Sequence, residues 1–395
     1  MEAVEMYTRE EPGVEGILES IRDLVPAIRA RRGEIEEARR MPRDLVDQLR
    51  STGIFRLGAP RDLGGEEARP VDLLKAIETV ATADGSAGWC AMIAVANGVS
   101  AGYLSEAGAR EMFADPAAPT AGIAAPGGRA TPADGGFRVS GRWSFASGIT
   151  HSDWAWAGAI VMENGRPRMT EMGPEIIHVC LPVSEVEIHD TWFVSGLCGT
   201  GSNDFSVSDA FIPESRVFSL LDPSRHRPEP LYQMPALGIF ASQLVSVSLG
   251  IARAALDELL ELAQTKVPSM SAVVLAEKPV AQVEVARAEG ALAAARSFLY
   301  ETVDNVFRTA SAGETPSLGQ LAMIRIAVMQ AAETGANVAR TANVLAGGSS
   351  IYTNSSLQRH ARDAEAVLHH FTVAPHTWED AGRVLLGRQP TAPAF

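Results

Sequence analysis

The sequence predicts an α+β protein of three domains, with an antiparallel β barrel or sandwich between two all-helical domains. Three observations support this prediction: helical spacing of apolar residues near the N-terminus, short glycine-punctuated segments rich in aromatic and β-branched residues in the middle, and long alanine-rich segments at the end. We expect an N-terminal helical domain over 1–116, a β domain over 117–222 and a C-terminal four-helix bundle over 230–395.

The N-terminal domain is predicted from apolar residues that recur at intervals of three and four over 17–113. Gly53 suits the end of one helix, and Pro70 suits the first turn of the next. Pro, Gly and Ala then cluster over 115–132, where helical periodicity is lost. This change in composition indicates a domain boundary.

The β domain is predicted from short segments bounded by Gly, Asp and Pro. Aromatic and β-branched side chains fit a pleated surface, and turn residues between them favour sharp reversals of the chain. The predicted strand segments are 135–148, 153–161, 175–183, 186–196 and 203–213.

The C-terminal domain begins after a proline-rich linker at 221–235. Four long amphipathic segments follow, and their lengths suit a helical bundle. They are Ala241–Gln264, Pro279–Ala312, Ser317–Leu345 and Leu357–Leu386. Polar residues interrupt the most apolar of them, so we expect no segment that spans a membrane.

Composition narrows the class of protein. The formal net charge is −14 and no Lys/Arg-rich run occurs, which argues against nucleic acid as a partner. The three cysteines are widely spaced, and the N-terminus is acidic where a signal peptide is basic, so we expect a cytoplasmic protein without disulfides. No His/Cys cluster has metal-ligand spacing, so we expect no metal.

Four segments, read in order, resemble the acyl-CoA dehydrogenase superfamily, and more closely its branch of two-component flavin monooxygenases. They are GRWSFASGITHSDW at 141–154, GLCGTGSNDFSVSDAFIP at 196–213, a P-x-x-Q helix pattern within 276–301 and a Gly-Gly loop with an Arg-Asp helix within 342–370. The resemblance spans nearly the whole chain and implies an acyl-CoA dehydrogenase-like fold. The Gln that precedes the Gly-Gly loop in the family is absent here.

The resemblance also implies a set of flavin contacts. Small residues let a backbone approach a flat ring, and Gly/Ser/Thr segments supply N–H and hydroxyl groups to a phosphate or ribityl chain. Without the resemblance, the same residues are consistent with ordinary turns. The implied cofactor residues are Trp143, Phe145, Ala146, Ser147 and Gly148, then Thr200, Gly201 and Ser202, and, from a neighbouring subunit, Gly347, Gly348 and Ser349. The candidate substrate-pocket residues are Trp89, Asn97, Trp192, Phe240 and Phe371.

Two histidines occupy the place where acyl-CoA dehydrogenases carry a catalytic glutamate. Counting from Arg362-Asp363 reaches His369 and His370. A histidine there can accept a proton near neutral pH or donate a hydrogen bond to an oxygenated flavin. Spacing favours His370 first and His369 second, with Ser147 as a further catalytic candidate. The alternative is that both are structural or solvated histidines at a helix end.

The implied function is the oxygenase component of a two-component monooxygenase. Reduced FMN or FAD would react with O₂ to form a C4a-hydroperoxyflavin, which would hydroxylate an aromatic or amine substrate in a water-poor pocket. No nicotinamide or nucleotide-phosphate motif occurs, so a separate flavin reductase is the implied partner. The resemblance also implies a homotetramer.

Two other functions remain open at this point. An acyl-CoA dehydrogenase-like enzyme with bound FAD would desaturate an acyl thioester, using Glu258, Glu261 or Glu365 as a displaced base. A cofactor-free interaction module would keep the fold without its chemistry.

Overall fold

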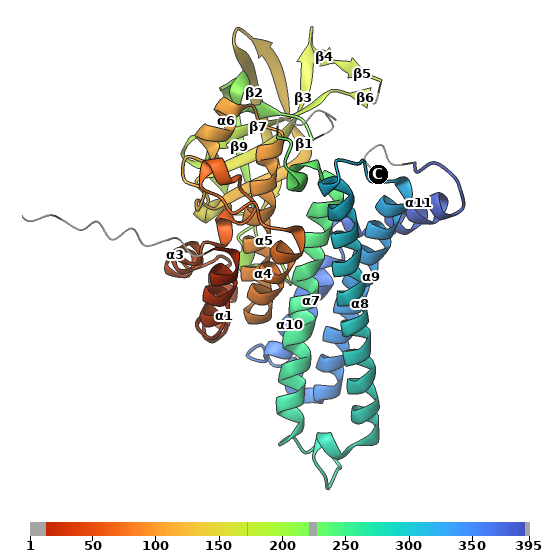
Figure 1. Cartoon of the computed structure of the whole chain (residues 1–395). Helices are drawn as coiled ribbons and strands as arrows, with labels where there is room; N and C mark the ends of the chain where they lie inside the picture. The colour runs from red at the N-terminus through yellow and green to blue at the C-terminus, as the bar shows by residue number, and fades with distance from the viewer. Residues whose placement is uncertain (1–12, 172, 221–226, 392–395) are drawn as a thin grey trace, which may run out of the picture.

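The computed structural model describes residues 13–171, 173–220 and 227–391. Three predictions fall partly outside the described residues. They concern the acidic N-terminus, the start of the linker predicted at 221–235, and the two ends of the chain. Within them, helices, sheet and helical bundle follow one another in the predicted order (Figure 1).

The N-terminal domain is built from helices that pack beside the sheet and against the upper part of the bundle (Figure 1). Gly53, at φ 85°, ends α3 as predicted. Asp84 caps α5, because its carboxylate accepts a hydrogen bond from the Ala87 N–H at 2.9 Å. Nearly all of α5 is buried, so this helix lies at the centre of the molecule. The helices are α1 (Val14–Ala30), α2 (Arg32–Ala38), α3 (Arg43–Thr52), α4 (Pro70–Ala83), α5 (Gly85–Val99) and α6 (Glu106–Met112).

The middle domain is a mixed sheet with strand order β10-β7-β3-β1-β2-β9-β8, and β4 pairs with β3. Its strands are β1 (Thr120–Ala133), β2 (Gly136–Ala146), β3 (Trp154–Glu163), β4 (Arg166–Pro167), β7 (Ile176–Pro182), β8 (Glu187–His189), β9 (Asn203–Pro213) and β10 (Val217–Phe218). A small separate ribbon pairs β5 (Met169–Thr170) with β6 (Gly173–Pro174).

The prediction of a wholly antiparallel sheet was wrong for one pair, because β1 and β3 run parallel. After the β1–β2 hairpin, the chain returns to the end at which β1 starts. The segment 147–153 then crosses to the other edge of β1, where β3 has to run in the same direction as β1. A connection this short leaves no composition signal that distinguishes it from a hairpin.

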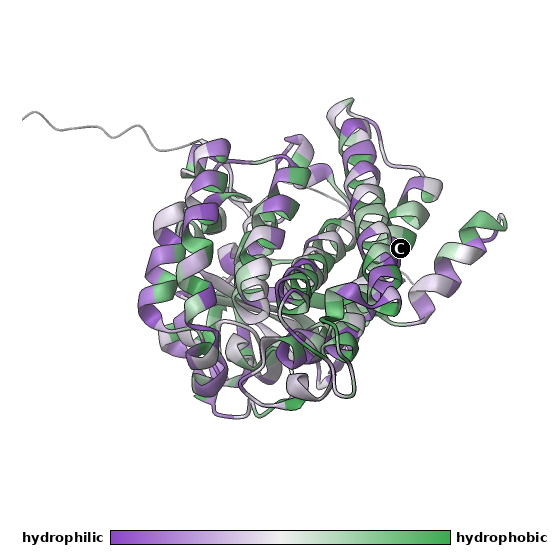
Figure 2. Ribbon diagram, turned by 90° about the horizontal axis from the view of Figure 1, so that it is seen from below, coloured by the Kyte–Doolittle hydropathy of each residue, from purple (hydrophilic) through white to green (hydrophobic). Residues whose placement is uncertain are grey.

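The C-terminal domain is a bundle whose helices are apolar where they face one another and polar on their outer turns (Figure 2). Its helices are α7 (Ala236–Ala263), α8 (Pro279–Ser311), α9 (Leu318–Ala346), α10 (Ser356–Val367) and α11 (His376–Leu385). Helix α7 is long and apolar enough to cross a membrane by length and composition alone, but 89% of its most apolar window is buried inside the protein.

The predicted fourth bundle helix, 357–386, is two helices rather than one. Helix α10 ends at Val367, and α11 begins after Pro375. Proline cannot continue the hydrogen bonding of a helix from the preceding turn and disfavours helix at the residue before it. The break places 368–375 outside any α-helix, and α11 stands to the side of the bundle (Figure 1).

Close packing of α7 on α4 gives a test of the fold. A Cβ at Gly250 would lie 2.5 Å from the Glu78 carbonyl oxygen and 2.6 Å from the Ala81 Cβ. Gly250→Ala should therefore lower stability by about 1–3 kcal/mol, measured as a lower thermal midpoint. The matched control is Gly290→Ala in α8, where a Cβ meets nothing within 4 Å and helix propensity predicts a gain of about 0.5–1 kcal/mol. Equal midpoints for the two variants would contradict this packing.

Candidate active site

A cavity of about 1040 Å³ lies where the three domains meet. Its walls come from α5, the end of β2, the loop before β9, helices α7 and α9, and the segment after α10. Pockets for small ligands are usually about 300–1,000 Å³, so this cavity is at the upper end of that range.

The end of β2 is shaped by a bulge. Between the pairs Trp143–Phe205 and Ala146–Asn203, β2 carries one residue more than β9. Phe145 is in the bulge and has a φ of 69°, a backbone conformation that residues other than glycine seldom adopt. Its ring is 68% exposed and meets the edge of Trp192 at 6.1 Å between ring centroids. The bulge therefore presents an aromatic face at the cavity wall.

A chain of hydroxyl groups runs along the same wall. The Trp89 indole N–H donates to Ser147 Oγ at 2.9 Å, and Ser147 Oγ lies 2.7 Å from Ser202 Oγ. Thr200 Oγ1 is 2.7 Å from Ser202 Oγ and donates to the Leu197 carbonyl at 2.9 Å. Each hydroxyl has a single proton, so Ser202 donates to Thr200 and Ser147 donates to Ser202. The predicted catalytic and cofactor residues Ser147, Ser202 and Thr200 thus form one polarised chain.

His370 follows α10 and lines the cavity among aromatic rings. Its ring centroid lies 6.0 Å from Trp89, 5.7 Å from Phe240 and 4.6 Å from Phe371. Burial lowers the pKa of His370 to about 4, so the imidazole is neutral at physiological pH. The Thr372 N–H lies 3.3 Å and the Thr372 hydroxyl oxygen 2.9 Å from His370 Nδ1, and donation by the N–H favours the tautomer with its proton on Nε2.

His369 also lines the cavity, but its side chain is exposed. Both histidines lie in the turn between α10 and α11 rather than on the continuous helix that was predicted. His370 is partly buried among aromatic rings and His369 is not. Spacing in the sequence also favours His370 as the first candidate.

The candidate substrate-pocket residues Trp89, Asn97, Trp192, Phe240 and Phe371 all line the cavity. Asn97 acts through a neighbour as well, because its Oδ1 accepts the Trp156 indole N–H at 2.9 Å while its Nδ2 donates to the Thr120 carbonyl at 3.0 Å. Asn97 therefore fixes a second tryptophan in the cavity wall.

Several predicted cofactor residues lie elsewhere. Trp143 is 1% exposed, stacks on Phe205 in the core of the sheet and donates to the Gly158 carbonyl, so its side chain cannot reach the cavity. Trp143 points away from Ser144, its neighbour on the strand, which lines the cavity, and the bulge at Phe145 keeps Phe145 from sharing the face of Trp143. Ala146, Gly148 and Gly201 are buried beside the hydroxyl chain without lining the cavity.

The glycine loop Gly347, Gly348 and Ser349 begins a 3₁₀ turn after α9 and does not line this chain's own cavity. Nothing lies within 4 Å of a Cβ placed at either glycine. The predicted contact with a neighbouring subunit therefore stays a prediction.

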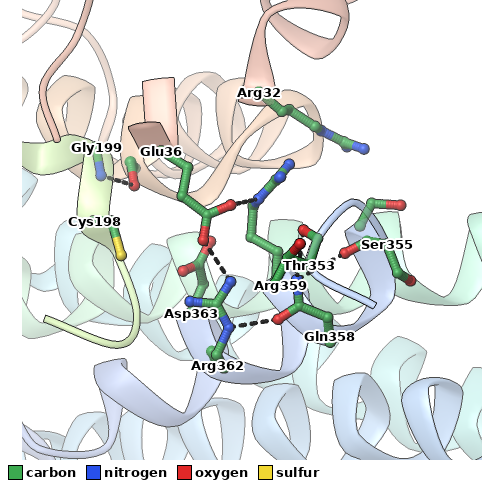
Figure 3. A network of polar contacts seen from close by, with 12 residues as sticks. Arg32, Glu36, Cys198, Gly199, Thr353, Ser355, Gln358, Arg359, Arg362 and Asp363 are labelled. Carbon is green, nitrogen blue, oxygen red and sulfur yellow. Dashed lines mark hydrogen bonds and ion pairs between the residues drawn. The ribbon is translucent and has the colours of Figure 1, made fainter. Parts of the chain in front are cut away.

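Helix α10 is fixed in place by a polar network (Figure 3). Glu36 of α2 binds both Arg359 and Arg362 of α10, and Arg362 also donates to the Ser195 carbonyl. Asp363 Oδ1 accepts the Leu197 N–H at 2.6 Å. Together, these contacts join all three domains at the start of the histidine turn.

Asp363 is fully enclosed beside Asp84. Burial, and then the neighbouring Asp84 carboxylate, raise the pKa of Asp363 to about 7. Gly196 and Gly199 allow this close approach, because a Cβ at Gly196 would collide with the Arg362 carbonyl and one at Gly199 with Ile35.

Two of the three carboxylates of the desaturase alternative, Glu258 and Glu261, do not line the cavity, whereas Glu365 lines it and is ion-paired. Glu258 binds Arg32 and His360, and its pKa is lowered to about 2. Glu261 does not line the cavity, and Glu365 is paired with Arg340 at 2.7 Å.

Two cavity residues could not be anticipated individually. Gln243 on α7 and Arg325 on α9 both line the cavity. A polar residue inside an otherwise apolar helical segment is the only available signal, and Ser246 and Ser248 give the same signal nearby without lining the cavity.

Comparison with known families gives two matches. The model described as acyl-CoA dehydrogenase, N-terminal domain, matches residues 14–115, and that described as acyl-CoA dehydrogenase, C-terminal domain, matches residues 242–375.

Individual relatives match almost the whole chain. An indole-3-acetate monooxygenase from Pseudomonas putida is 36% identical over 384 residues, covering 96% of this chain and 94% of the relative. The oxygenase component of an FADH₂-dependent resorcinol hydroxylase from Rhizobium sp. is 30% identical over 379 residues, covering 90% of both chains. The solved structure of the 3-HSA hydroxylase from Rhodococcus sp. RHA1 superposes with a TM-score of 0.90 at 28% identity, covering 96% of this chain and 99% of that one. The predicted fold class is confirmed.

The lowered pKa of His370 predicts a dependence of stability on pH. Between the folded pKa of about 4 and the ordinary value of 6.5, the unfolded state binds the proton and the folded state does not. This residue therefore makes stability fall as the solution is acidified, by about 2 kcal/mol between pH 7 and pH 5. His370→Gln should show a smaller loss in chemical denaturation at the two pH values. His369→Gln, at the exposed neighbouring position, should keep the wild-type slope, and identical slopes in all three proteins would contradict a buried neutral His370.

Proposed function

The chain belongs to the acyl-CoA dehydrogenase family, among its flavin-dependent monooxygenases, and we propose that it hydroxylates a small aromatic molecule held in the cavity beside His370. It is an oxygenase component that uses reduced flavin, like the relatives named as oxygenase components. The observation that carries the proposal is a neutral histidine within an aromatic cage where a dehydrogenase has its carboxylate base. Desaturation of an acyl thioester is not supported, because the relatives are hydroxylases and monooxygenases.

The cavity suits a flavin in size and chemistry. The exposed Phe145 ring and Trp192 offer aromatic surface, and Ser147, Thr200 and Ser202 bring hydroxyl groups to the same wall. These residues would hold the ring system, and reduced flavin, when bound, activates O₂ for transfer of one oxygen atom to the substrate. Apolar side chains form most of the remaining wall, which excludes water from the reaction.

His370 would act as a hydrogen-bond donor. Its Nδ1 accepts from Thr372, so the proton on Nε2 faces away from that contact and is available to the cavity. A neutral donor in an apolar cage stabilises developing negative charge on oxygen without introducing a buried positive charge. Of the two roles open to this histidine from sequence, the structure favours donation over proton removal.

Ser147 would act by position. Its proton is directed to Ser202 and it already accepts from Trp89, so its remaining lone pair can accept a further hydrogen bond. The hydroxyl chain would thereby keep β2 and α5 at a fixed separation beside the flavin.

We also propose a separate flavin reductase as partner, a cytoplasmic location and a homotetramer. The far end of the bundle exposes Val344, Ile351 and Tyr352 around the predicted glycine loop. Large apolar side chains exposed together favour a protein contact. Light scattering of the purified protein would show the mass of a tetramer.

Replacing His370 tests the proposed role directly. His370→Asn should reduce hydroxylated product per O₂ consumed at least tenfold, with more hydrogen peroxide released, because the donor beside the reacting oxygen is displaced. Reduced-flavin affinity, measured anaerobically, should change less than about threefold. His369→Asn is the control and should retain wild-type coupling of O₂ consumption to product. Wild-type coupling in His370→Asn would remove this histidine from the mechanism.

A further inference from the structure

Gln243 is a buried amide without a hydrogen-bond partner among the described residues. Its side chain is 0% exposed, and neither Oε1 nor Nε2 makes a hydrogen bond within that part of the chain. An unpaired amide away from water is strongly disfavoured, because it has lost its hydrogen bonds to solvent and gained none in return. Native proteins keep such groups where a ligand, ion or water completes the hydrogen bonds.

Other polar side chains of α7 pair with the carbonyl one turn earlier on the same helix. Ser242 Oγ donates to the Gly238 carbonyl at 2.8 Å, and Gln264 Nε2, just past the end of the helix, donates to the Leu260 carbonyl at 3.2 Å. A glutamine can therefore satisfy its amide on this helix. Gln243 does not do so, which leaves its amide to a group from outside the helix.

Gln243 lies beside the aromatic rings of the cavity. Ile239, Phe240 and Gln243 all line the cavity, and their spacing of three and four residues places them on one face of α7. The Phe240 and His370 ring centroids are 5.7 Å apart. A group bound to Gln243 would therefore lie at the edge of an aromatic molecule that contacts Phe240 and His370.

The arginine and glutamate side chains in the described cavity wall each have an opposite charge nearby. The pairs are Arg362 with Glu36, Glu365 with Arg340, and Arg325 with Asp380. An ionised ligand would lose its hydration and gain little compensation from side chains that are already paired. A neutral ligand group is therefore favoured at Gln243.

The chemistry of the amide narrows the group further. Nε2 carries two donor hydrogens and Oε1 is an acceptor, and both atoms of Gln243 are unpaired. An ether oxygen only accepts hydrogen bonds, and an indole N–H only donates, so each would leave one of these atoms without a partner. A hydroxyl or a carboxamide both donates and accepts.

We propose that Gln243 selects the substrate by binding a neutral group that both donates and accepts a hydrogen bond, namely a hydroxyl or a carboxamide on the aromatic ring. The group would lie on the α7 side of the cavity, with the ring against Phe240 and His370. The assignment rests on the proposed function for the identity of the cavity, and it makes Gln243 a determinant of specificity.

Four probes with the same naphthalene ring test the proposal. The compounds 2-naphthol and 2-naphthamide both donate and accept, 2-methoxynaphthalene only accepts, and 2-naphthoate is an anion. Each is titrated anaerobically into the full-length protein with reduced flavin. Wild-type protein should bind 2-naphthol or 2-naphthamide about tenfold or more tightly than 2-methoxynaphthalene and 2-naphthoate, and the tighter of the two identifies the group.

Gln243→Met removes the amide and nearly keeps the length of the side chain. It should weaken binding of the preferred probe roughly 5- to 50-fold and change the affinity for 2-methoxynaphthalene less than about threefold. Without ligand, this variant should unfold at a higher temperature than wild type, because an unpaired buried amide has been replaced by an apolar group. Gln330→Met makes the same change at an exposed position on α9 and should keep the wild-type affinities.

The proposal is overturned if wild-type protein binds all four probes alike, binds none of them or prefers 2-naphthoate. It is also overturned if Gln243→Met weakens all probes alike, which would give Gln243 a packing role only. A lower unfolding temperature for unliganded Gln243→Met would overturn it as well, since a bound water would then already complete the amide.

These results are separable from the proposed function. Hydroxylation of aromatic molecules without a preference among the probes would leave the monooxygenase intact and remove the role of Gln243. Selective binding of 2-naphthol or 2-naphthamide without any oxygenated product would leave the binding site and remove the monooxygenase.

Discussion

The position of helix α10 is the constraint on which the active site depends. Glu36 from the N-terminal domain binds two arginines of α10, and the buried Asp363 takes a backbone N–H from the loop of the β domain. Removing one partner from such an enclosed network leaves an uncompensated charge, so the three domains hold one another in a single arrangement. The turn that carries His370 starts where this helix ends, and its location follows from the same contacts.

Each domain supplies one residue to a row of three side chains in contact: Trp89, Ser147 and His370. Asp84 fixes the start of α5, which places Trp89 one turn later, and Trp89 donates to Ser147 at the end of β2. The same indole packs edge-on against His370 from the C-terminal domain. A flavin bound beside Ser147 and a substrate bound beside His370 would therefore both contact Trp89 within the one cavity.

Much of this arrangement could be predicted from the sequence. Helical and strand periodicity gave the order of the elements, and the spacing from Arg362-Asp363 led to His370. What escaped prediction depends on contacts between distant segments. The parallel pairing of β1 and β3 depends on which edge of β1 the chain reaches after β2. The face to which the Trp143 side chain points depends on the register of β2. The break before α11 has a local cause in Pro375. The prediction missed it because the helical periodicity continues on both sides of this proline. Gln243 looks like any polar residue on an apolar helix until the fold shows that its amide has no hydrogen-bond partner among the described residues.

The most direct test of the central claim is the fate of molecular oxygen. The protein would be supplied with photochemically reduced flavin, ¹⁸O₂ and a small aromatic compound, and the mass of the product would be measured by mass spectrometry. A monooxygenase is expected to give a hydroxylated product that carries one ¹⁸O atom. A product that has lost two hydrogens and gained no label, or consumption of O₂ without any labelled product across a panel of aromatic compounds, would contradict the account.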